Sequence, residues 1–217
     1  MDATSEENFG SEFFEKDGDL LVSAARESIR TYFKTSRIQA PDSVSKDTRF
    51  EKKLGCFVTL KENDLEKSLR GCIGFPEPMY KLAKALPESA VSAAVHDPRF
   101  RPIRAGDLQS LLVEVSILTK PSLIRVDHKE IPQSIVIGRD GLIIKWEYGA
   151  GLLLPQVAAE FNWNAEEFLC NLSMKAGASP DQWQSPSSMI YKFHAQVFQE
   201  ISPNGNVILE KAPKNDA

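Results

Sequence analysis

The segment 69–74 reads LRGCIG and places the thiol of Cys72 two residues from the guanidinium of Arg70, with Gly71 and Gly74 beside it. Glycine lets another backbone or a ligand come close, and a neighbouring guanidinium would hold a thiol as thiolate, its nucleophilic form. Cys72 is therefore a candidate catalytic nucleophile, and Arg70, Gly71 and Gly74 are candidate ligand-binding residues. The alternative is that Cys72 is a small buried core residue, as free cysteines often are.

Glu114 is a candidate catalytic partner of this segment, because it is a charged residue in the otherwise apolar run 111–119. A buried charge is costly unless it is paired, and strand alternation places Arg70 and Cys72 on one side of their strand. We therefore predict an ion pair between Arg70 and Glu114. If one side of the sheet is open to solvent, Glu114 would instead face water.

A second polar group, DPRF, occupies residues 97–100. Asp97 and Arg99 are candidate ligand-binding residues, because a planar guanidinium recognises carboxylate or phosphate groups. Arg101 and Arg104 extend this segment into a local basic patch. The other interpretation is that Asp97 caps a turn and that the arginines tie the loop to the sheet or face water.

The histidines offer acid–base chemistry near neutral pH, and His96 is the candidate that would assist Cys72. Neither His96 nor His194 has a partner at the spacing of a metal site, and no CxxC pair occurs, so no metal site and no cofactor are predicted. The GxxxxGK, GxGxxG, HExxH and GxSxG motifs are also missing, which removes the usual starting points for nucleotide binding and hydrolysis.

Composition excludes several classes of protein. Hydrophobic residues make up 42% of the chain and charged residues 26%, as in ordinary globular proteins. The longest apolar runs are far shorter than the ~20 residues that cross a bilayer, so no membrane association is predicted. The acidic N-terminus lacks the features of a secretory signal, and we therefore expect a cytoplasmic protein. A net charge of -4 gives no general attraction to nucleic acid.

The elements that would position these residues belong to an α+β fold. Apolar residues at every fourth position predict a helix from Asp19, its N-cap, to Thr35. The β-prone runs 55–60 and 69–75 flank a polar stretch and predict an antiparallel hairpin. If its turn is centred near Asp64, Cys56 and Cys72 would face each other across the hairpin.

The order of elements repeats along the chain. In the first half, a short helix around 79–85 and a second helix with Pro87 in its first turn lead to the strand 111–119. The second half has strands 134–138 and 142–146 around the turn 139–141, helices opened by Pro155 and by Asn164, the latter stopped by Gly177, and strand 189–200. Two strand–strand–helix–helix–strand units indicate an internal duplication and a mostly antiparallel sheet.

Six motifs in order resemble the AMMECR domain family, which is named for the Alport syndrome and elliptocytosis chromosomal region protein. The motifs are LRGCIG at 69–74, DPRFRPI at 97–103, VEVSIL at 113–118, GRDGLII at 138–144, GLLLPQVAAE at 151–160 and KAG at 175–177. The resemblance implies an α+β fold of two unequal subdomains with a groove between them. It implies no reaction, because the family's biochemical activity is not established. Microbial members are linked to radical SAM and Memo-type proteins, which implies a role beside such a protein.

The resemblance adds two candidate ligand-binding residues, Gln156 and Lys175, which belong to its motifs. Gln156 stands at the start of a predicted helix whose free amides would hold an anion, and ordinary helix initiation is the alternative. His96 departs from the family motif, which asks for no histidine there, so a Cys–His pair would not be general to the family.

The sequence therefore predicts a domain at 19–200, resembling the AMMECR domain and containing the two subdomains, between flexible tails at 1–18 and 201–217. Its predicted function is that of a binding module centred on LRGCIG, which holds a small anionic ligand or a protein partner. An enzyme with Cys72 as nucleophile is the alternative, and it is less favoured because no base for Cys72 can be assigned. The sequence does not define an oligomeric state.

Overall fold

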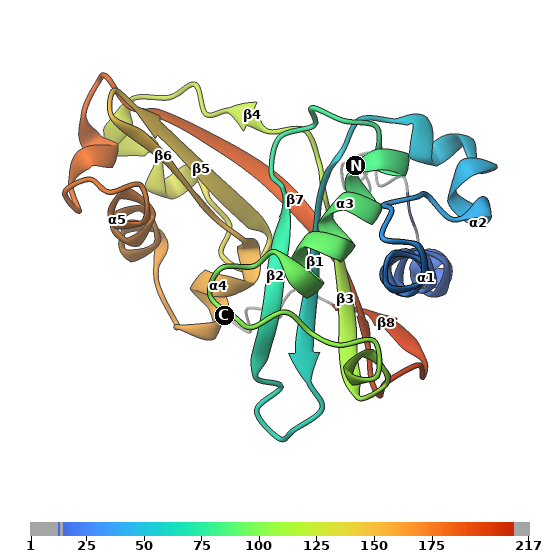
Figure 1. Cartoon of the computed structure of the whole chain (residues 1–217). Helices are drawn as coiled ribbons and strands as arrows, with labels where there is room; N and C mark the ends of the chain where they lie inside the picture. Colours follow the sequence, from blue (N-terminus) through green and yellow to red (C-terminus); the bar gives the residue numbers. More distant parts are fainter. Residues whose placement is uncertain (1–12, 14, 211–217) are drawn as a thin grey trace, which may run out of the picture. The chain divides into compact units, whose positions relative to one another are not determined.

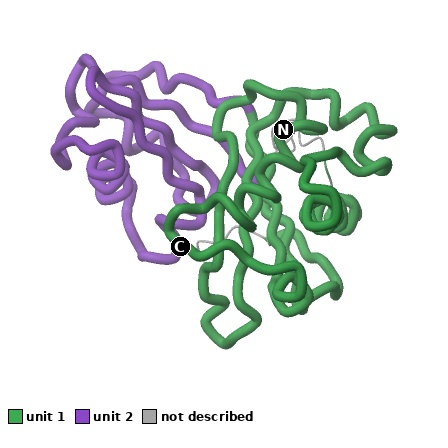
Figure 2. The backbone as a smooth tube through the Cα atoms, in the orientation of Figure 1, with its two compact units in different colours: residues 1–119, 196–210 green, residues 120–195, 211–217 purple. Residues whose placement is uncertain are grey.

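The computed structural model describes residues 13 and 15–210. The chain divides into two compact units: unit 1 comprises residues 1–119 and 196–210, and unit 2 comprises residues 120–195 and 211–217 (Figure 2). The α+β fold and the two subdomains of unequal size agree with the expectation from the motifs. The groove between subdomains stays a prediction.

Unit 1 contains a sheet with the strand order β2-β1-β3-β7, and β8 pairs with β7 (Figure 1). The strands are β1 (Gly55–Glu62), β2 (Leu69–Phe75), β3 (Leu111–Leu118), the last residues of β7 (Met189–Glu200) and β8 (Val207–Leu209). The helices are α1 (Gly18–Thr35), α2 (Asp42–Ser45) and α3 (Leu82–Val95), with 3-10 turns η1 (Glu15–Asp17), η2 (Thr48–Glu51) and η3 (Asp107–Gln109). Strand β1 is antiparallel to both β2 and β3.

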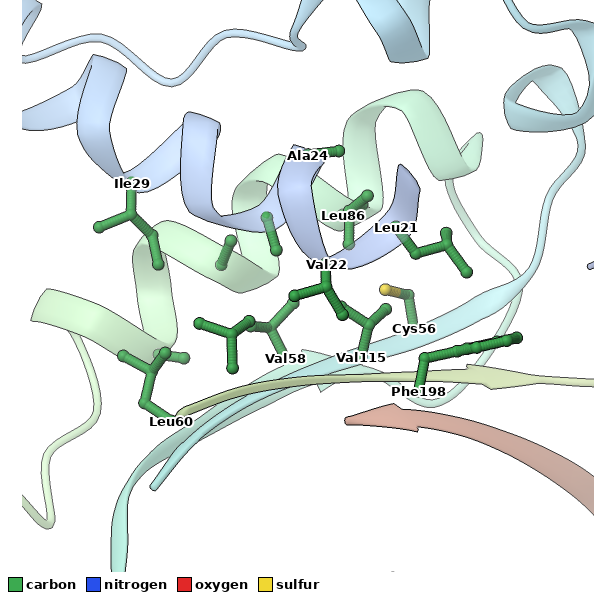
Figure 3. Packing of buried hydrophobic residues seen from close by; sticks show 14 of the residues in the cluster. Leu21, Val22, Ala24, Ile29, Cys56, Val58, Leu60, Leu86, Val115 and Phe198 are labelled. Carbon is green, nitrogen blue, oxygen red and sulfur yellow. The ribbon is translucent and has the colours of Figure 1, made fainter. Parts of the chain in front are cut away.

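The core of unit 1 lies between one face of this sheet and the helices α1 and α3 (Figure 3). Cys56, Val58 and Leu60 alternate along β1 and are completely buried, as strand alternation requires for a face that packs on helices. Thr59, which lies between Val58 and Leu60, and Lys61, which follows Leu60, therefore project from the opposite face of the same strand. This face carries the polar groups that the sequence singled out.

Unit 2 contains β7 paired with β5, and β5 paired with β6, all antiparallel. Its strands are β4 (Ser122–Leu123), β5 (Asp140–Trp146), β6 (Gly149–Leu153) and the first residues of β7. Its helices are α4 (Pro155–Glu160) and α5 (Ala165–Lys175), with 3-10 turns η4 (His128–Glu130), η5 (Pro132–Ser134) and η6 (Gln182–Gln184). Phe168, Leu169 and Leu172 of α5 pack against Leu142 and Ile144 of β5 to form a separate core.

Locally coded features agree with the sequence predictions. The hairpin of β1 and β2, the strands β3 and β7, and the helix ending at Thr35 are all present. Helix α5 begins with a complete capping box, in which Asn164 and Glu167 exchange hydrogen bonds. Gly177 follows this helix with a φ of 75°, which glycine adopts without strain. The N-cap of α1 is Asp17, and Asp19 lies in the first turn instead.

Two predicted elements were wrong. Residues 134–138 are not a strand: Ser134 is the last residue of η5, and the following residues lead into a turn in which the backbone N–H of Val136 donates to the Asp140 carboxylate at 2.9 Å. Strand β6 is the true hairpin partner of β5. The two helices expected around Pro87 are one helix, α3, which contains this proline. The first half therefore runs strand–strand–helix–strand, because proline marked an internal position and not a helix start.

The folded structure extends beyond the predicted domain boundaries on both sides. Phe13 is fully buried and its ring lies 5.4 Å from that of Phe50 in an edge-to-face contact. Within the predicted C-terminal tail, β8 pairs with β7. The tail predictions for residues 1–12, 14 and 211–217 lie outside the described residues. No helix in the part of the chain that the structure describes is long and apolar enough to cross a membrane.

A glycine in the second strand of each hairpin lets a helix backbone approach the sheet. A Cβ atom built on Gly71 of β2 would lie 2.1 Å from the carbonyl oxygen of Ala93 in α3. In unit 2, a Cβ atom on Gly151 of β6 would lie 2.8 Å from the backbone nitrogen of Ala176, next to the end of α5. Both contacts are too close for a side chain unless the backbone shifts, so in both units a glycine sets how closely the helix packs on the hairpin.

We predict that Gly71→Ala lowers the free energy of unfolding by about 2 to 3 kcal/mol, because α3 must move away from β2 to admit a methyl group. Gly106→Ala is the matched control: Gly106 has a φ of -72° and its Cβ would meet nothing within 4 Å. This control should change stability by less than about 1 kcal/mol. Urea denaturation of both variants measures the difference, and equal midpoints would contradict the close packing.

Candidate functional site

Three polar side chains form one row across the face of the unit 1 sheet that is turned away from the helices. In the register of the sheet, Thr59 of β1 lies opposite Cys72 of β2 on one side and opposite Glu114 of β3 on the other. Residues directly opposite each other in paired strands project from the same face. The Thr59 hydroxyl donates to the Cys72 sulfur at 3.3 Å, and Glu114 is only 5% exposed. We refer to Cys72, Thr59 and Glu114 as the polar row.

The predicted ion pair between Arg70 and Glu114 was wrong. The Glu114 carboxylate accepts a hydrogen bond from Lys61 Nζ at 2.7 Å, whereas Arg70 lies 3.7 Å from Glu62. The reason is the strand order: β1 lies between β2 and β3, so Lys61 on the middle strand is closer to Glu114 than Arg70 is. The register also shifts between Leu60 and Lys61, which displaces Arg70 from regular pairing.

The backbone of Cys72 is held by the side chains of the DPRF segment. The Cys72 N–H donates to Asp97 Oδ2 at 2.8 Å, and Arg99 Nη2 donates to the Cys72 carbonyl at 3.1 Å. Strand β2 is at the end of the strand order, so these groups on its outer edge have no strand partner. Asp97 and Arg99 supply the missing partners. We call this arrangement the Cys72 clamp, and it matches the interpretation in which the arginine ties the loop to the sheet.

Asp97 and Arg99 also bind each other. Arg99 donates from Nε and Nη2 to the two carboxylate oxygens of Asp97, at 2.9 and 2.7 Å. These hydrogen bonds, with those from the backbone of Cys72 and Arg99, hold the pKa of Asp97 far below its usual range despite burial. Asp97 is therefore ionised at neutral pH, where its carboxylate accepts these hydrogen bonds.

The Cys72 thiol is held in its protonated form. Burial raises its pKa above the usual value, and the negative charge of Glu114 raises it further, whereas the hydrogen bond from Thr59 acts in the opposite direction. The charge of Arg99 does lower the pKa, as expected of a neighbouring guanidinium, but it does not outweigh burial. Arg70, which carried that expectation, has no hydrogen bond to the thiol among the described residues.

Three further residues that the sequence analysis considered for the site, His96, Cys56 and Gly74, do not contact the Cys72 thiol as expected or serve the packing of the strands. His96 is exposed at the end of α3, where its ring contacts Tyr32, and no hydrogen bond among the described residues joins it to Cys72. Cys56 lies opposite Phe75 and not opposite Cys72, because the hairpin turn is further along the chain than assumed. Gly74 admits close backbone packing: its Cβ would lie 2.2 Å from the Cys56 carbonyl oxygen.

The remaining predicted ligand-binding residues belong to unit 2. Gln156 is half-buried in the first turn of α4, and Lys175 is exposed at the end of α5. The polar row and the Cys72 clamp belong to unit 1, so a common site for both sets stays a prediction. Sequence reasoning missed Thr59 and Lys61, although their alternation with the apolar residues of β1 was a usable signal.

A buried carboxylate that the sequence analysis did not single out, Asp140, lies in unit 2. Asp140 is completely buried and accepts hydrogen bonds from His194 Nε2 at 2.9 Å and from Arg139 Nε at 2.8 Å. Burial by itself raises its pKa, but these hydrogen bonds outweigh burial and hold the pKa below the usual range. Asp140 and His194 face each other across β5 and β7. The GRDG motif thus joins these two strands.

Comparison with known proteins places this geometry in a family. The family model described as AMMECR1 matches residues 22–198, which is most of the chain. The chain belongs to the AMMECR1 family. The resemblance carried by the six motifs is thereby confirmed.

Relatives of the AMMECR1 family share both sequence and fold with the chain. Protein MJ0810 of Methanocaldococcus jannaschii is 47% identical over 197 residues, covering 90% of this chain and 96% of the relative. Protein PF1979 of Pyrococcus furiosus is 45% identical over 193 residues, covering 88% and 91%. The crystal structure of the uncharacterized protein PH0010 from Pyrococcus horikoshii is similar with a TM-score of 0.86 at 40% identity, covering 93% of this chain and all of that one. None of these names states a reaction.

We predict that Asp97→Asn lowers the free energy of unfolding by about 2 kcal/mol at pH 7, because charge-assisted hydrogen bonds to Arg99 and to the Cys72 N–H are weakened. The folded-state pKa of Asp97 lies below its unfolded value near 3.8. Its contribution is therefore complete above that value and is lost as the pH falls through the folded-state pKa. Urea denaturation should show a constant difference between pH 8 and about pH 5, and a smaller one at about pH 3. A difference independent of pH would exclude the carboxylate charge as its origin.

Proposed function

We propose that the chain is a binding module that recognises anionic groups with the loop 97–104 at the edge of β2. The supporting observation is the state of Arg99: 54% of its side chain is exposed, although Nε and Nη2 are fixed by Asp97 and by the Cys72 carbonyl. A guanidinium that is already ordered loses little entropy when it binds. Its planar donors suit a carboxylate or phosphate group.

The charge of the loop supports an anionic ligand. Arg101 and Arg104 are exposed and lie within five residues of Arg99, on a chain whose formal net charge is -4. A basic segment on an acidic protein attracts an anion locally without attracting polyanions in general. Such binding should weaken with added salt, because exposed charges are screened over about 10 Å at moderate ionic strength.

The macromolecular ligand that we propose is an acidic segment of a partner protein. The resemblance to microbial family members points to a radical SAM or Memo-type protein as that partner. Co-purification of the tagged chain with such a protein from the same organism tests the idea. The complex should be lost in the double variant Arg101→Gln and Arg104→Gln, which leaves the Cys72 clamp intact. An unchanged yield of the complex would exclude the arginine loop as the contact.

The enzyme alternative, with Cys72 as nucleophile, has less support. The thiol has a raised pKa, and Glu114, the nearest carboxylate in the polar row, is already paired with Lys61. Nucleophilic catalysis by cysteine requires a lowered pKa or an adjacent base. The polar groups around Cys72 therefore favour a binding surface, because a catalytic site of this kind would need an activated thiol.

Titration with inorganic phosphate and with a glutamate-rich peptide tests anion recognition. In ¹H–¹⁵N spectra, the amides of 70–74 and 97–104 should show saturable shifts, since the ligand contacts this loop. Arg99→Lys keeps the charge but loses the planar fork, so we expect roughly tenfold weaker binding, equivalent to about 1.4 kcal/mol. Arg37→Lys, at an exposed position after α1, is the control. Shifts that do not saturate, or equal affinity in Arg99→Lys, would contradict the proposal.

Alkylation of Cys72 with iodoacetamide, followed by residue-resolved mass spectrometry across pH, separates binding from catalysis. We expect the labelling midpoint of Cys72 to lie above that of an unperturbed cysteine, because burial raises its pKa and only the thiolate reacts. Glu114→Gln should lower this midpoint by removing a nearby negative charge. A midpoint well below that of glutathione would instead revive the enzyme alternative.

A further inference from the structure

The turn between β7 and β8 contains Asn204, the one asparagine in the sequence that is followed by glycine. Residues 202–205 form a β-turn in which the Gly205 N–H donates to the Ser202 carbonyl at 2.8 Å. Pro203 at the second position and a φ of 57° for Asn204 at the third are typical of a type II turn. Asn204 and Gly205 are both exposed, so water reaches them.

The side chain of Asn204 is held by helix α1. Nη2 of Arg30 donates to Asn204 Oδ1 at 2.7 Å, across 174 residues of sequence. Two hydrogen bonds therefore restrain this dipeptide: one holds the side-chain amide of Asn204, and the other holds the backbone nitrogen of Gly205. Both lie in an exposed turn of unit 1, where hydrogen bonds open by local fluctuation without unfolding of the core.

An asparagine followed by glycine contains an electrophile beside a nucleophile. The electrophile is the amide carbon Cγ of Asn204, and the nucleophile is the backbone nitrogen of Gly205. Glycine has no Cβ atom to obstruct the approach of the two atoms. We propose that Asn204 is a site of spontaneous deamidation, and that the hydrogen bonds from Arg30 and to Ser202 set its rate by restraining the reacting groups.

The reaction needs only water. Solvent base removes the proton of the Gly205 nitrogen, and the electron pair left on this nitrogen forms a bond to Asn204 Cγ. The bond from Cγ to Nδ2 then breaks, and Nδ2 leaves as ammonia after it takes up protons from the solvent. Water adds to either carbonyl of the resulting cyclic imide and breaks the bond from that carbonyl to nitrogen. One water is consumed and one ammonia is released, and nothing is oxidised or reduced.

The two products differ in the backbone of the turn. Aspartate keeps the original backbone and gives Arg30 a charged acceptor, so the turn persists. Isoaspartate continues the chain through Cβ and Cγ, which adds one atom to the backbone. The pairing of β8 with β7 depends on the length of this turn, in which the Ile201 N–H also donates to the Asn206 carbonyl at 3.0 Å. The isoaspartate product therefore loosens β8.

The site is independent of the proposed function. None of its residues belongs to the polar row, to the Cys72 clamp or to the loop 97–104. A failure of anion binding would therefore leave the deamidation site intact, and the reverse also holds.

Incubation of the folded full chain over a range of pH, followed by residue-resolved mass spectrometry, tests the proposal. Position 204 should convert to aspartate and isoaspartate, and it should convert faster at higher pH, because the Gly205 nitrogen must lose a proton. Asn162 is a matched control in the same molecule: it is exposed and has a φ of 53°, but Trp163 follows it. Asn162 should remain unmodified over the same period.

Two variants test the role of Arg30. Arg30→Met removes the donor that holds Asn204, so conversion should be severalfold faster than in the parent. Arg37→Met, at an exposed position after α1, removes the same charge and should react at the parent rate. The proposal is overturned if Asn204 stays unmodified in the folded chain while the chain unfolded in urea is converted. It is also overturned if Arg30→Met reacts no faster than the parent.

Hydrogen exchange of the separated products tests the effect on β8. The amides of Val207–Leu209 should exchange faster in the isoaspartate product than in Asn204→Asp, which carries the same charge on a normal backbone. Equal exchange in the two proteins would overturn the predicted loosening of β8.

Discussion

The edge of β2 at Cys72 is the constraint on which the rest of unit 1 depends. An edge strand presents unpaired N–H and C=O groups, and these need partners if the strand is to stay ordered and not pair with another chain. Asp97 and Arg99 satisfy the N–H and the carbonyl of Cys72 from the side. The LRGCIG and DPRF motifs therefore act together. LRGCIG supplies the unpaired backbone groups of Cys72, and DPRF supplies the side chains that form hydrogen bonds with them.

The close approach of α3 to β2 makes this arrangement possible. Gly71 lets the Ala93 carbonyl of α3 approach the strand, and the helix ends two residues later at Val95, with His96 as its C-cap. The end of the helix therefore places Asp97 at the outer edge of β2, where it binds Cys72, the residue that follows Gly71. The hydrogen bond from the Ile103 N–H to the Ala94 carbonyl then returns the loop to the helix. The close approach of α3 to β2 thus explains both the need for glycine at position 71 and the position of the Asp97 carboxylate beside Cys72.

Sequence patterns predicted what nearby residues determine and failed where distant strands meet. The capping box of Asn164 and the β1–β2 hairpin were predicted, because each depends on residues a few positions apart. The partner of Glu114 was not, because Lys61 becomes its neighbour only when β1 lies between β2 and β3. Asp140 was missed for the same reason: its partner His194 is distant in sequence and adjacent only in the sheet. The sequence patterns carried no information on the order of the strands in the sheet, and this order determines which charged side chains are neighbours.

The two units use a buried aspartate in different ways. Asp97 and Asp140 each bind a neighbouring arginine and a backbone N–H, and each has a pKa below the usual range. Asp140 is further bonded to His194 between two paired strands, so it serves to join them. Asp97 instead satisfies an edge strand. The arginine bound to each aspartate is about half exposed, 54% for the side chain of Arg99 and 47% for that of Arg139. The two carboxylates therefore differ in the backbone that they hold, because Asp140 joins two paired strands and Asp97 completes the edge of β2.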